Sequence, residues 1–254
     1  NDVGGGRLSI TGYGIRYGLD LYSNFSLYSA DPVNGDQIRQ VDLRTVTGLN
    51  AQYQKTFALG PVSLGSTTGV QVRSDVIDNA LSHVAKREAL GELTRAHVAQ
   101  QTFGVFTELD AGFTRWLRVI GGVRADGFHY ALDDKLDRVA SGTLTTALVS
   151  PKGAVIITPH EWLSFFGNVG HGFHSNDARA LQAPTVATSY EVGTRFKPSR
   201  ALEVGLVAWG MNLDSELVWV GDEGHTESSG SSHRRGLELD AKVRLNAAFA
   251  VIKP

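Results

Sequence analysis

The chain has 254 residues, 24 lysines and arginines against 26 aspartates and glutamates, and a formal net charge of −2. This balance excludes the basic field of a nucleic-acid-binding protein and the acidic tracts typical of disorder, so no nucleic acid partner is expected. The absence of cysteine excludes disulfide frameworks, thiolate metal sites and cysteine nucleophiles. No apolar run approaches the roughly 18 residues of a membrane-spanning helix, so only strands could cross a membrane.

Apolar and charged residues alternate with period two along much of the chain, which predicts β-strands. The alternation is clearest over residues 237–245 and recurs over 69–77 and 117–126. Strands are expected over residues 12–29, 40–56, 64–80, 101–110, 116–131, 143–158, 162–173, 187–197, 201–219 and 234–245, and a further one begins at Ala247. Residues 82–99 have irregular apolar positions, and we interpret them as part of a loop rather than a short helix.

The connections between the expected strands alternate in length. Short ones cover residues 58–62, 111–115, 160–161 and 198–200, and longer polar ones cover 30–39, 81–100, 132–142, 174–186 and 221–233. Tight turns on one rim and long loops on the other are typical of an outer-membrane β-barrel. Several expected strands also exceed the roughly 9–11 residues that a tilted strand needs to cross the hydrocarbon layer. The sequence therefore predicts an antiparallel transmembrane barrel.

Aromatic residues near the strand ends fit this prediction, because amphipathic rings favour the membrane interface. They are Trp116, Trp162, Phe165, Tyr190, Phe196 and Trp219. Ordinary strand aromatics in a soluble core are the alternative interpretation.

The charged face of the strands is expected to line the barrel lumen. Its candidate residues are Arg73, Asp75, Arg118, Arg124, Asp126, Glu191, Arg195, Glu238, Asp240, Lys242 and Arg244. A soluble barrel of modest size fills its interior with apolar side chains, so this pattern favours a barrel whose apolar face meets outer-membrane lipid. An antiparallel sheet with one wet side gives the same alternation, and a soluble all-β binding module stays an alternative.

Five segments, in this order, resemble the barrel of TonB-dependent receptors. They are DPVNGDQIRQVDLR (31–44), LVSPKGAVIITP (148–159), FFGNVGHGFHSNDARA (165–180), TSYEVGTRFKP (188–198) and SSHRRGLELDAKVRL (231–245). The resemblance implies a bacterial outer-membrane barrel of about 22 strands, of which residues 1–254 supply about 10 or 11. No segment resembles the plug domain, and the ending AFAVIKP lacks the family's final aromatic residue, so the chain is expected to be a fragment. A smaller closed barrel of roughly 10 or 12 strands is the alternative architecture.

The resemblance also implies a function, namely active transport of a scarce nutrient, with an iron–siderophore complex or another metal chelate as the expected ligand. Energy would come from the TonB complex through the missing plug. A passive porin-like barrel is the alternative function. Ligand-binding candidates lie in two of the long loops: His174, Asn176, Asp177, Arg179, Asp222, Glu223 and His225.

Other chemistry finds little support in the sequence. No GxSxG elbow, Walker-type loop or HExxH motif occurs, and the spacing of Gly167, Gly170 and Gly172 is wrong for a dinucleotide loop. The sequence therefore predicts neither an enzyme nor a cofactor.

Two groups of metal-ligand residue types stand in the expected loops. The loop histidines, including His171 and His233, could gather around a metal, but solvated loop histidines are the simpler interpretation. Residues 31–36 resemble a calcium loop without its closing glutamate, and an Asn-Gly turn at Asn34 explains them better. No metal site is expected.

Overall fold

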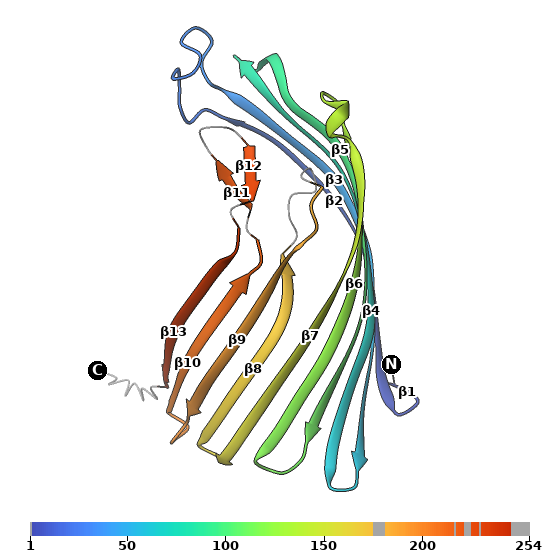
Figure 1. Cartoon of the computed structure of the whole chain (residues 1–254), viewed down its shortest axis with the longest axis vertical. Coiled ribbons are helices and arrows are strands. Elements are labelled where there is room, and N and C mark those ends of the chain that lie inside the picture. The colour runs from blue at the N-terminus through green and yellow to red at the C-terminus, as the bar shows by residue number, and fades with distance from the viewer. Residues whose placement is uncertain (1, 175–180, 216, 221–224, 229, 245–254) are drawn as a thin grey trace, which may run out of the picture.

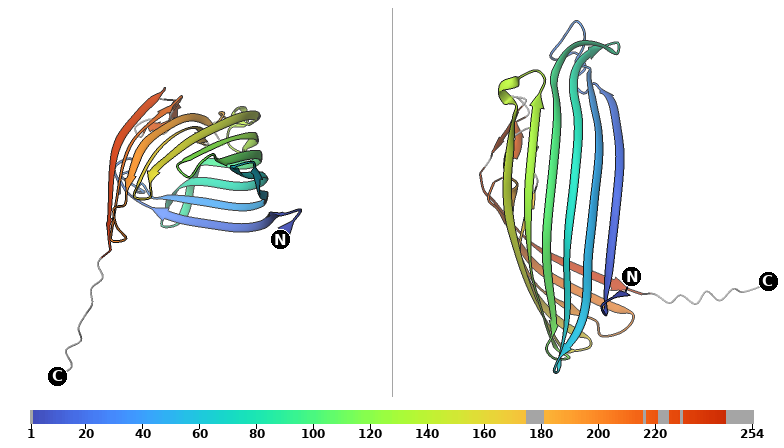
Figure 2. Two further views of the ribbon diagram at one scale, coloured as in Figure 1. Left: turned by 90° about the horizontal axis from the view of Figure 1, so that it is seen from below. Right: turned by 90° about the vertical axis from the view of Figure 1, so that its right-hand side faces the viewer.

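The alternating pattern folds into one curled antiparallel sheet of 11 strands (Figure 1). The computed structural model describes residues 2–174, 181–215, 217–220, 225–228 and 230–244. The strand order is β1-β2-β3-β4-β5-β6-β7-β8-β9-β10-β13, so strands adjacent in the sheet follow one another along the chain. The described sheet does not close on itself: β1 and β13 form its two edges, and the curl stays open (Figure 2).

Most of the long strands lie close to the predicted positions. The sheet consists of β1 (Asp2–Val3), β2 (Gly6–Ser23), β3 (Ile38–Leu59), β4 (Val62–Ala85), β5 (Glu88–Gly112), β6 (Leu117–Asp134), β7 (Gly142–His160), β8 (Leu163–His174), β9 (Thr185–Phe196), β10 (Leu202–Leu213) and β13 (Ser232–Val243). A separate small sheet pairs β11 (Leu217–Val220) with β12 (His225–Ser228), and a short 3-10 helix, η1, covers Arg138–Ala140. The predicted all-β antiparallel architecture is confirmed. Among the described residues, no helix is long and apolar enough to span a membrane.

The prediction of a long loop over residues 81–100 is wrong. These residues extend β4 and β5 into one tall hairpin, whose turn is Lys86 and Arg87 with φ of 52° and 71°. Two consecutive positive φ angles are typical of the type I′ turns that favour two-residue hairpins. Register shifts lie between Leu81 and Ser82 and between His83 and Val84. Such bulges interrupt the period-two alternation, which is why the sequence pattern looked irregular there.

The first strand is also displaced from its predicted range, 12–29. It begins at Gly6 and ends at Ser23, and the next residues form a loop around the carboxylate of Asp36. That carboxylate accepts hydrogen bonds from the backbone N–H groups of Ala30 (3.0 Å) and Asp31 (2.7 Å). Gly35 has a φ of 82°, as the Asn-Gly turn requires. The aromatic residues of this segment resembled strand residues, but side-chain to backbone hydrogen bonds organise it as a loop.

The predicted strand over residues 201–219 is too long. β10 ends at Leu213, and residues 217–220 belong to the separate β11–β12 hairpin, which also occupies part of the predicted loop 221–233. At the end of β10, the N–H of Asp214 donates to the carbonyl of Val186 (3.0 Å). The strand predicted from Ala247 onward lies outside the described residues.

The sheet divides between β7 and β8, and Pro151 explains where. The uppermost pair joining these strands is Lys152 with Gly170, and above it β7 continues to pair with β6 alone. The N–H of Thr158 donates to the carbonyl of Trp116, which lies on the β6 side. Backbone groups of successive strand residues point to opposite sides, so the even-numbered residues of β7 face β6 and the odd-numbered ones face β8. Pro151 is such a residue and has no N–H to donate. The upper ends of β7 and β8 diverge accordingly (Figure 1).

One face of the sheet, the outer face, is apolar over the turn-side part of the strands. Its exposed residues include Val70, Val72 and Val76 of β4, Phe103, Val105 and Leu109 of β5, Val155 and Ile157 of β7, Tyr190, Val192 and Phe196 of β9, and Leu237, Leu239 and Val243 of β13. A soluble module would bury such a face against another layer, and the described chain offers no such layer. Among the described residues, this face is left uncovered, as the membrane interpretation expects.

The aromatic side chains at the short turns fit the interface prediction. Trp116 and Trp162 lie in the turns before β6 and β8, and both are about half exposed. Trp162 packs edge-on against Phe196, with ring centroids 5.7 Å apart. Trp219, predicted at the end of a long strand, instead lies in β11.

Candidate functional site

The inner face of the sheet, opposite the apolar face, collects the charged residues that the sequence singled out. Directly paired residues of an antiparallel sheet share a face. Following the register from β4 to β13 places Arg73, Asp75, Arg118, Arg124, Asp126, Glu191, Arg195, Glu238, Asp240 and Lys242 on this face. Arg244 lies one residue beyond β13, and its N–H donates to the carbonyl of Ala201 (2.8 Å).

Many charges on the inner face pair with one another. Three strands carry an arginine and an aspartate two residues apart, which puts both side chains on the same face. The pairs are Asp42 with Arg44, Arg73 with Asp75, and Arg124 with Asp126. Asp75 and Asp126 are only 3% and 4% exposed, and each carboxylate receives two nitrogens of its arginine at 2.6 to 2.8 Å. Without these guanidinium partners, burial of the carboxylates would be strongly unfavourable.

Further pairs cross between strands. They are Arg118 with Asp110, Lys152 with Glu108, Arg195 with Glu203, and the amide of Asn168 with Glu191. The inner face is therefore hydrophilic, yet much of its charge is balanced within the wall itself.

A hollow of about 280 Å³ opens on this face across β4 to β8. Gln71, Phe106, Glu108, Arg124, Ser150, Lys152 and His171 line it, together with Thr67 and the chain at Thr107 and Val123. Glycines lie under its two cations: a Cβ at Gly104 would stand 2.2 Å from Arg124 Nη2, and one at Gly122 would stand 3.0 Å from Lys152 Cε. Both cationic side chains can lie flat against the wall because these positions have no side chain.

Higher along the same strands the inner face becomes apolar and buried. Ala96, Val98 and Leu132 form a cluster, and Leu181 from the β8–β9 connection packs against it. Phe173 of β8 contacts Phe128 of β6 edge-on, with centroids 5.1 Å apart. β8 therefore turns over the inner face once it has left β7, which confirms that this face lies inside the curl.

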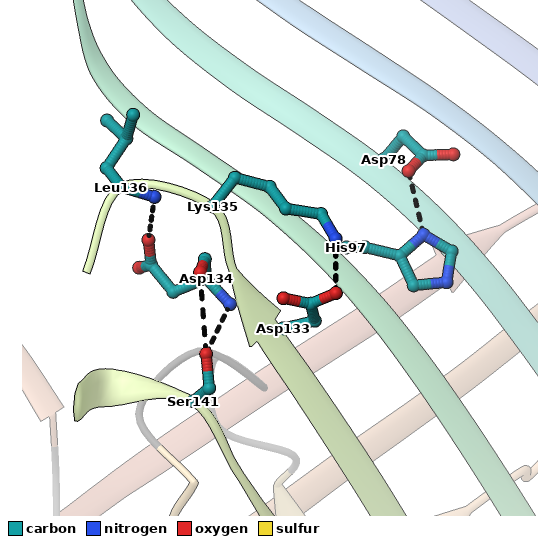
Figure 3. A network of polar contacts seen from close by, with 7 residues as sticks. All are labelled: Asp78, His97, Asp133, Asp134, Lys135, Leu136 and Ser141. Atoms are coloured by element: carbon teal, nitrogen blue, oxygen red, sulfur yellow. Dashed lines mark hydrogen bonds and ion pairs between the residues drawn. The ribbon is translucent and has the colours of Figure 1, made fainter. Parts of the chain in front are cut away.

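The outer face of the same region becomes polar. His97 Nδ1 lies 2.7 Å from Asp78 Oδ1 on the neighbouring strand. Lys135 pairs with Asp133 close by (Figure 3). Nearby, Asp20 and Arg39 form a two-point ion pair at 2.8 Å. This reversal of polarity was missed in the sequence, although residues 127–133 show it. There the large apolar residues, Phe128, Tyr130 and Leu132, occupy even positions, and His129 and Asp133 occupy odd ones.

The loop residues predicted to bind ligand are only partly described. Asn176, Asp177, Arg179, Asp222 and Glu223 lie outside the described residues. His174 is the exposed last residue of β8, and His225 begins β12. His233 Nδ1 lies 2.8 Å from Asn212 Oδ1. Among the described residues, no group of three metal-ligand side chains occurs.

Sequence reasoning also missed the residues around the hollow other than Arg124 and His171. Lys152 stands in the quoted segment 148–159, but its partner Glu108 is on β5, and only the strand register brings the two together.

Together, the open curled sheet, the apolar outer face and the hydrophilic inner face are typical of part of the wall of a membrane β-barrel. The family model described as TonB dependent receptor-like, beta-barrel, matches residues 4–252, and the chain belongs to this family. The resemblance seen in the sequence is thereby confirmed. Members of the family are outer-membrane β-barrels of Gram-negative bacteria, which fixes the location of this chain.

Solved structures show the same fold. The unliganded ferric citrate transporter FecA superposes with a TM-score of 0.75 at 13% identity, covering 93% of this chain and 36% of that one. The siderophore receptor PiuA from Acinetobacter baumannii gives 0.75 at 12%, covering 96% and 42%. The ferric-catecholate import receptor Fiu from E. coli K12 gives 0.71 at 14%, covering 97% and 44%. The chain thus spans less than half the length of these receptors. No curated protein sequence matches it.

Proposed function

We propose that this chain forms part of the wall of an active-transport receptor that imports a scarce nutrient, an iron–siderophore complex or another metal chelate. The match of residues 4–252 to the receptor-barrel family carries the proposal. Structurally similar proteins named as a ferric citrate transporter, a ferric-catecholate import receptor and a copper transporter support a metal chelate as cargo. At identities of 13%, 14% and 16%, these structures share the fold of this chain, and a shared fold does not determine the cargo. The cargo is therefore part of the proposal.

In this proposal residues 1–254 are barrel wall, the outer face contacts outer-membrane lipid, and the plug domain and the TonB contact belong to other parts of the receptor. The paired charges of the inner face support it. A wall that hydrates its lumen while balancing its own charge can pass a hydrophilic cargo without holding it by unpaired charges.

Uptake by the bacterium that encodes the receptor tests the proposal. We expect deletion of the receptor gene to abolish uptake of one radiolabelled iron or copper chelate from a panel, and re-expression to restore it. Deletion of TonB should have the same effect as deletion of the receptor. Uptake that continues without TonB would instead establish a passive porin-like barrel.

The loop residues can be tested in the same assay. We propose that His174, Asn176, Asp177, Arg179, Asp222, Glu223 and His225 contribute to ligand capture at the cell surface. One variant carries alanine at the four of these positions that lie in 174–179, and another carries alanine at the three that lie in 222–225. Each set of substitutions should weaken ligand binding to whole cells. Unchanged binding after both sets of substitutions would remove these residues from the site.

A further inference from the structure

A second hollow, of about 220 Å³, opens on the inner face across β2 to β5. Its lining side chains are Ser9, Thr11, Asn50, Gln52, Gln71 and Phe106, together with the chain at Ala51 and Val70. The strand register places these side chains in two adjacent rows of paired residues, and neither row contains a charged residue between β2 and β5. This neutral hollow therefore differs from the rest of the inner face, where paired charges predominate.

Glycines in these rows let larger side chains lie across the wall. Gly69 pairs with Phe106, and Gly104 pairs with Gln71. A Cβ at Gly69 would stand 2.6 Å from Phe106 Cζ, so the ring of Phe106 extends over this glycine to the rim of the neutral hollow. The guanidinium of Arg124 lies over Gly104 in the same way and reaches Gln71.

A second aromatic ring borders the neutral hollow on its loop side. Tyr13 follows Thr11 by two residues on β2, so both side chains lie on the inner face. The end of the Tyr13 ring lies where a Cβ of Gly48 would be, and Gly48 is two residues from Asn50 on β3. Two aromatic rings therefore flank a group of neutral polar side chains.

The polar side chains of the neutral hollow have hydrogen-bonding capacity to spare. Within the part of the chain that the structure describes, no side-chain hydrogen bond is made by Ser9, Thr11, Asn50 or Gln52. Gln71 Oε1 accepts from Arg124 Nη1 at 2.7 Å, which leaves the amide N–H groups of Gln71 as donors. Hydroxyl and amide groups both donate and accept, so the lining suits a neutral ligand that does the same.

We infer that the neutral hollow binds a neutral sugar ring. Each sugar hydroxyl donates and accepts, as the hydroxyl and amide side chains of the lining do. The C–H groups of a sugar ring carry a slight positive charge and pack well against aromatic rings, such as those of Phe106 and Tyr13, whose faces are negative. The volume of about 220 Å³ accommodates one hexose. The inference does not depend on import of a metal chelate, because it concerns binding to the wall alone.

Binding of the methyl glycosides of glucose, galactose and mannose to the purified full receptor tests the inference. The detergent should have no sugar head group, as in dodecyldimethylamine oxide. We expect at least one glycoside to bind in saturation-transfer NMR. Sorbitol is the matched control ligand, since it has the hydroxyls without the ring. It should bind at least about fivefold more weakly, because a flexible chain loses more freedom on binding.

Two variants test whether the sugar occupies the neutral hollow. Asn50→Ala should lower the affinity for the bound glycoside about fivefold, because it removes a donor and an acceptor. Phe106→Leu should have an effect of about the same size, because leucine keeps an apolar side chain but has no ring. Asn168→Ala is the matched control variant and should leave binding unchanged. Asn168 lies on the inner face of β8, where it donates to Glu191 at 2.9 Å, and does not line the hollow.

Thermal melts confirm that each variant is folded. Weaker binding in both hollow variants, with binding unchanged in the Asn168 variant, supports the inference. Absence of binding by all three glycosides would overturn it, as would binding that is unchanged in either hollow variant or equally weakened in the Asn168 variant. A structure of the full receptor in which a peptide segment fills the neutral hollow would also overturn it.

Discussion

The turn-side and loop-side parts of β4, β5 and β6 have opposite polarity on the same two faces. On β6, Val123 points outward and Arg124 inward, whereas six residues later His129 points outward and Tyr130 inward. The alternation keeps its period and reverses its phase. The inner face is apolar where β8 and the β8–β9 connection cover it. We propose that the outer face is likewise apolar where lipid covers it and polar above the lipid.

The length of the turn-side part of these strands matches the thickness of the hydrocarbon layer of a bilayer. On β4, the outer face lacks charge from Leu64 to Val76, and Asp78 follows. Twelve residue steps span about 40 Å along a strand, and a tilt of about 40° reduces this to about 30 Å of membrane thickness. We therefore infer that the phase reversal marks the outer boundary of the hydrocarbon layer.

The largest expected effect tests the buried inner face above this boundary. Phe128→Ala should lower the free energy of unfolding by about 3–5 kcal/mol, because Phe128 is 4% exposed and packs against Tyr130 and Phe173. Phe103→Ala on the outer face of the adjacent strand is the control, since lipid fills the space left by its side chain. Denaturant unfolding of the receptor in vesicles measures both. Equal losses would show that the two faces do not differ.

A charge introduced on the outer face tests whether the turn-side part of the sheet lies in lipid. Val70→Arg should destabilise the receptor by about 2–4 kcal/mol, because Val70 lies midway along the uncharged part of β4. Ala131→Arg, on the outer face of β6 between His129 and Asp133, should cost about 0–1 kcal/mol. The same vesicle unfolding experiment compares them. A large loss for Ala131→Arg would place the membrane boundary higher than we infer.

The division of the sheet can be tested by restoring a donor. Pro151→Ala should let β7 and β8 pair for a further step and stabilise the region by about 1 kcal/mol. Hydrogen exchange should show slower exchange at residue 151 and at His171. Pro61→Ala, in the β3–β4 turn, should leave this exchange unchanged. Fast exchange at both sites in the Pro151 variant would mean that the proline is not the cause.

The smallest effect concerns the β2–β3 loop outside the membrane. Backbone N–H groups of Ala30 and Asp31 hold the pKa of Asp36 below its ordinary value of 3.8. A lowered carboxylate pKa stabilises the loop above that ordinary value, and the stabilisation is lost as the pH falls through the lowered pKa. Loop proteolysis should therefore rise below about pH 4 and stay constant from about pH 5 to 8.

Asp36→Asn should speed loop proteolysis roughly threefold at neutral pH, because an amide oxygen accepts hydrogen bonds more weakly than a carboxylate. Val33→Ala, at an exposed position of the same loop, is the control. No change in the Asp36 variant would show that the carboxylate does not organise the loop.

Period-two alternation predicted the strands best where a single phase persists. The turn-side part of β6 was recognisable because its odd positions are apolar and its even positions charged. The bulges near Ser82 and Val84 interrupt the period in β4, and residues 81–100, the upper parts of β4 and β5, were interpreted as a loop. On β6 the predicted strand, 116–131, extends past Asp126, but the reversal of phase there was not recognised. A single sequence does not show that the surroundings of a strand change along its length.

The candidate site was predictable only as a face. The sequence placed Arg124 and Asp126 together, because residues two positions apart on one strand lie on the same face. The pairing of Lys152 with Glu108 and the hollow beneath them depend on the register of β5, β6 and β7, which local alternation does not determine.

The proline that divides β7 from β8 also has a mechanical consequence. Tension that pulls β8–β13 away from β1–β7 acts across hydrogen bonds oriented along the force, and these break one after another from the end of the ladder. Pro151 sets that end, so the ladder carrying the load extends only from Lys152 to His160. Under strain in the envelope, the wall should yield first along this line, while the long ladders on either side remain intact.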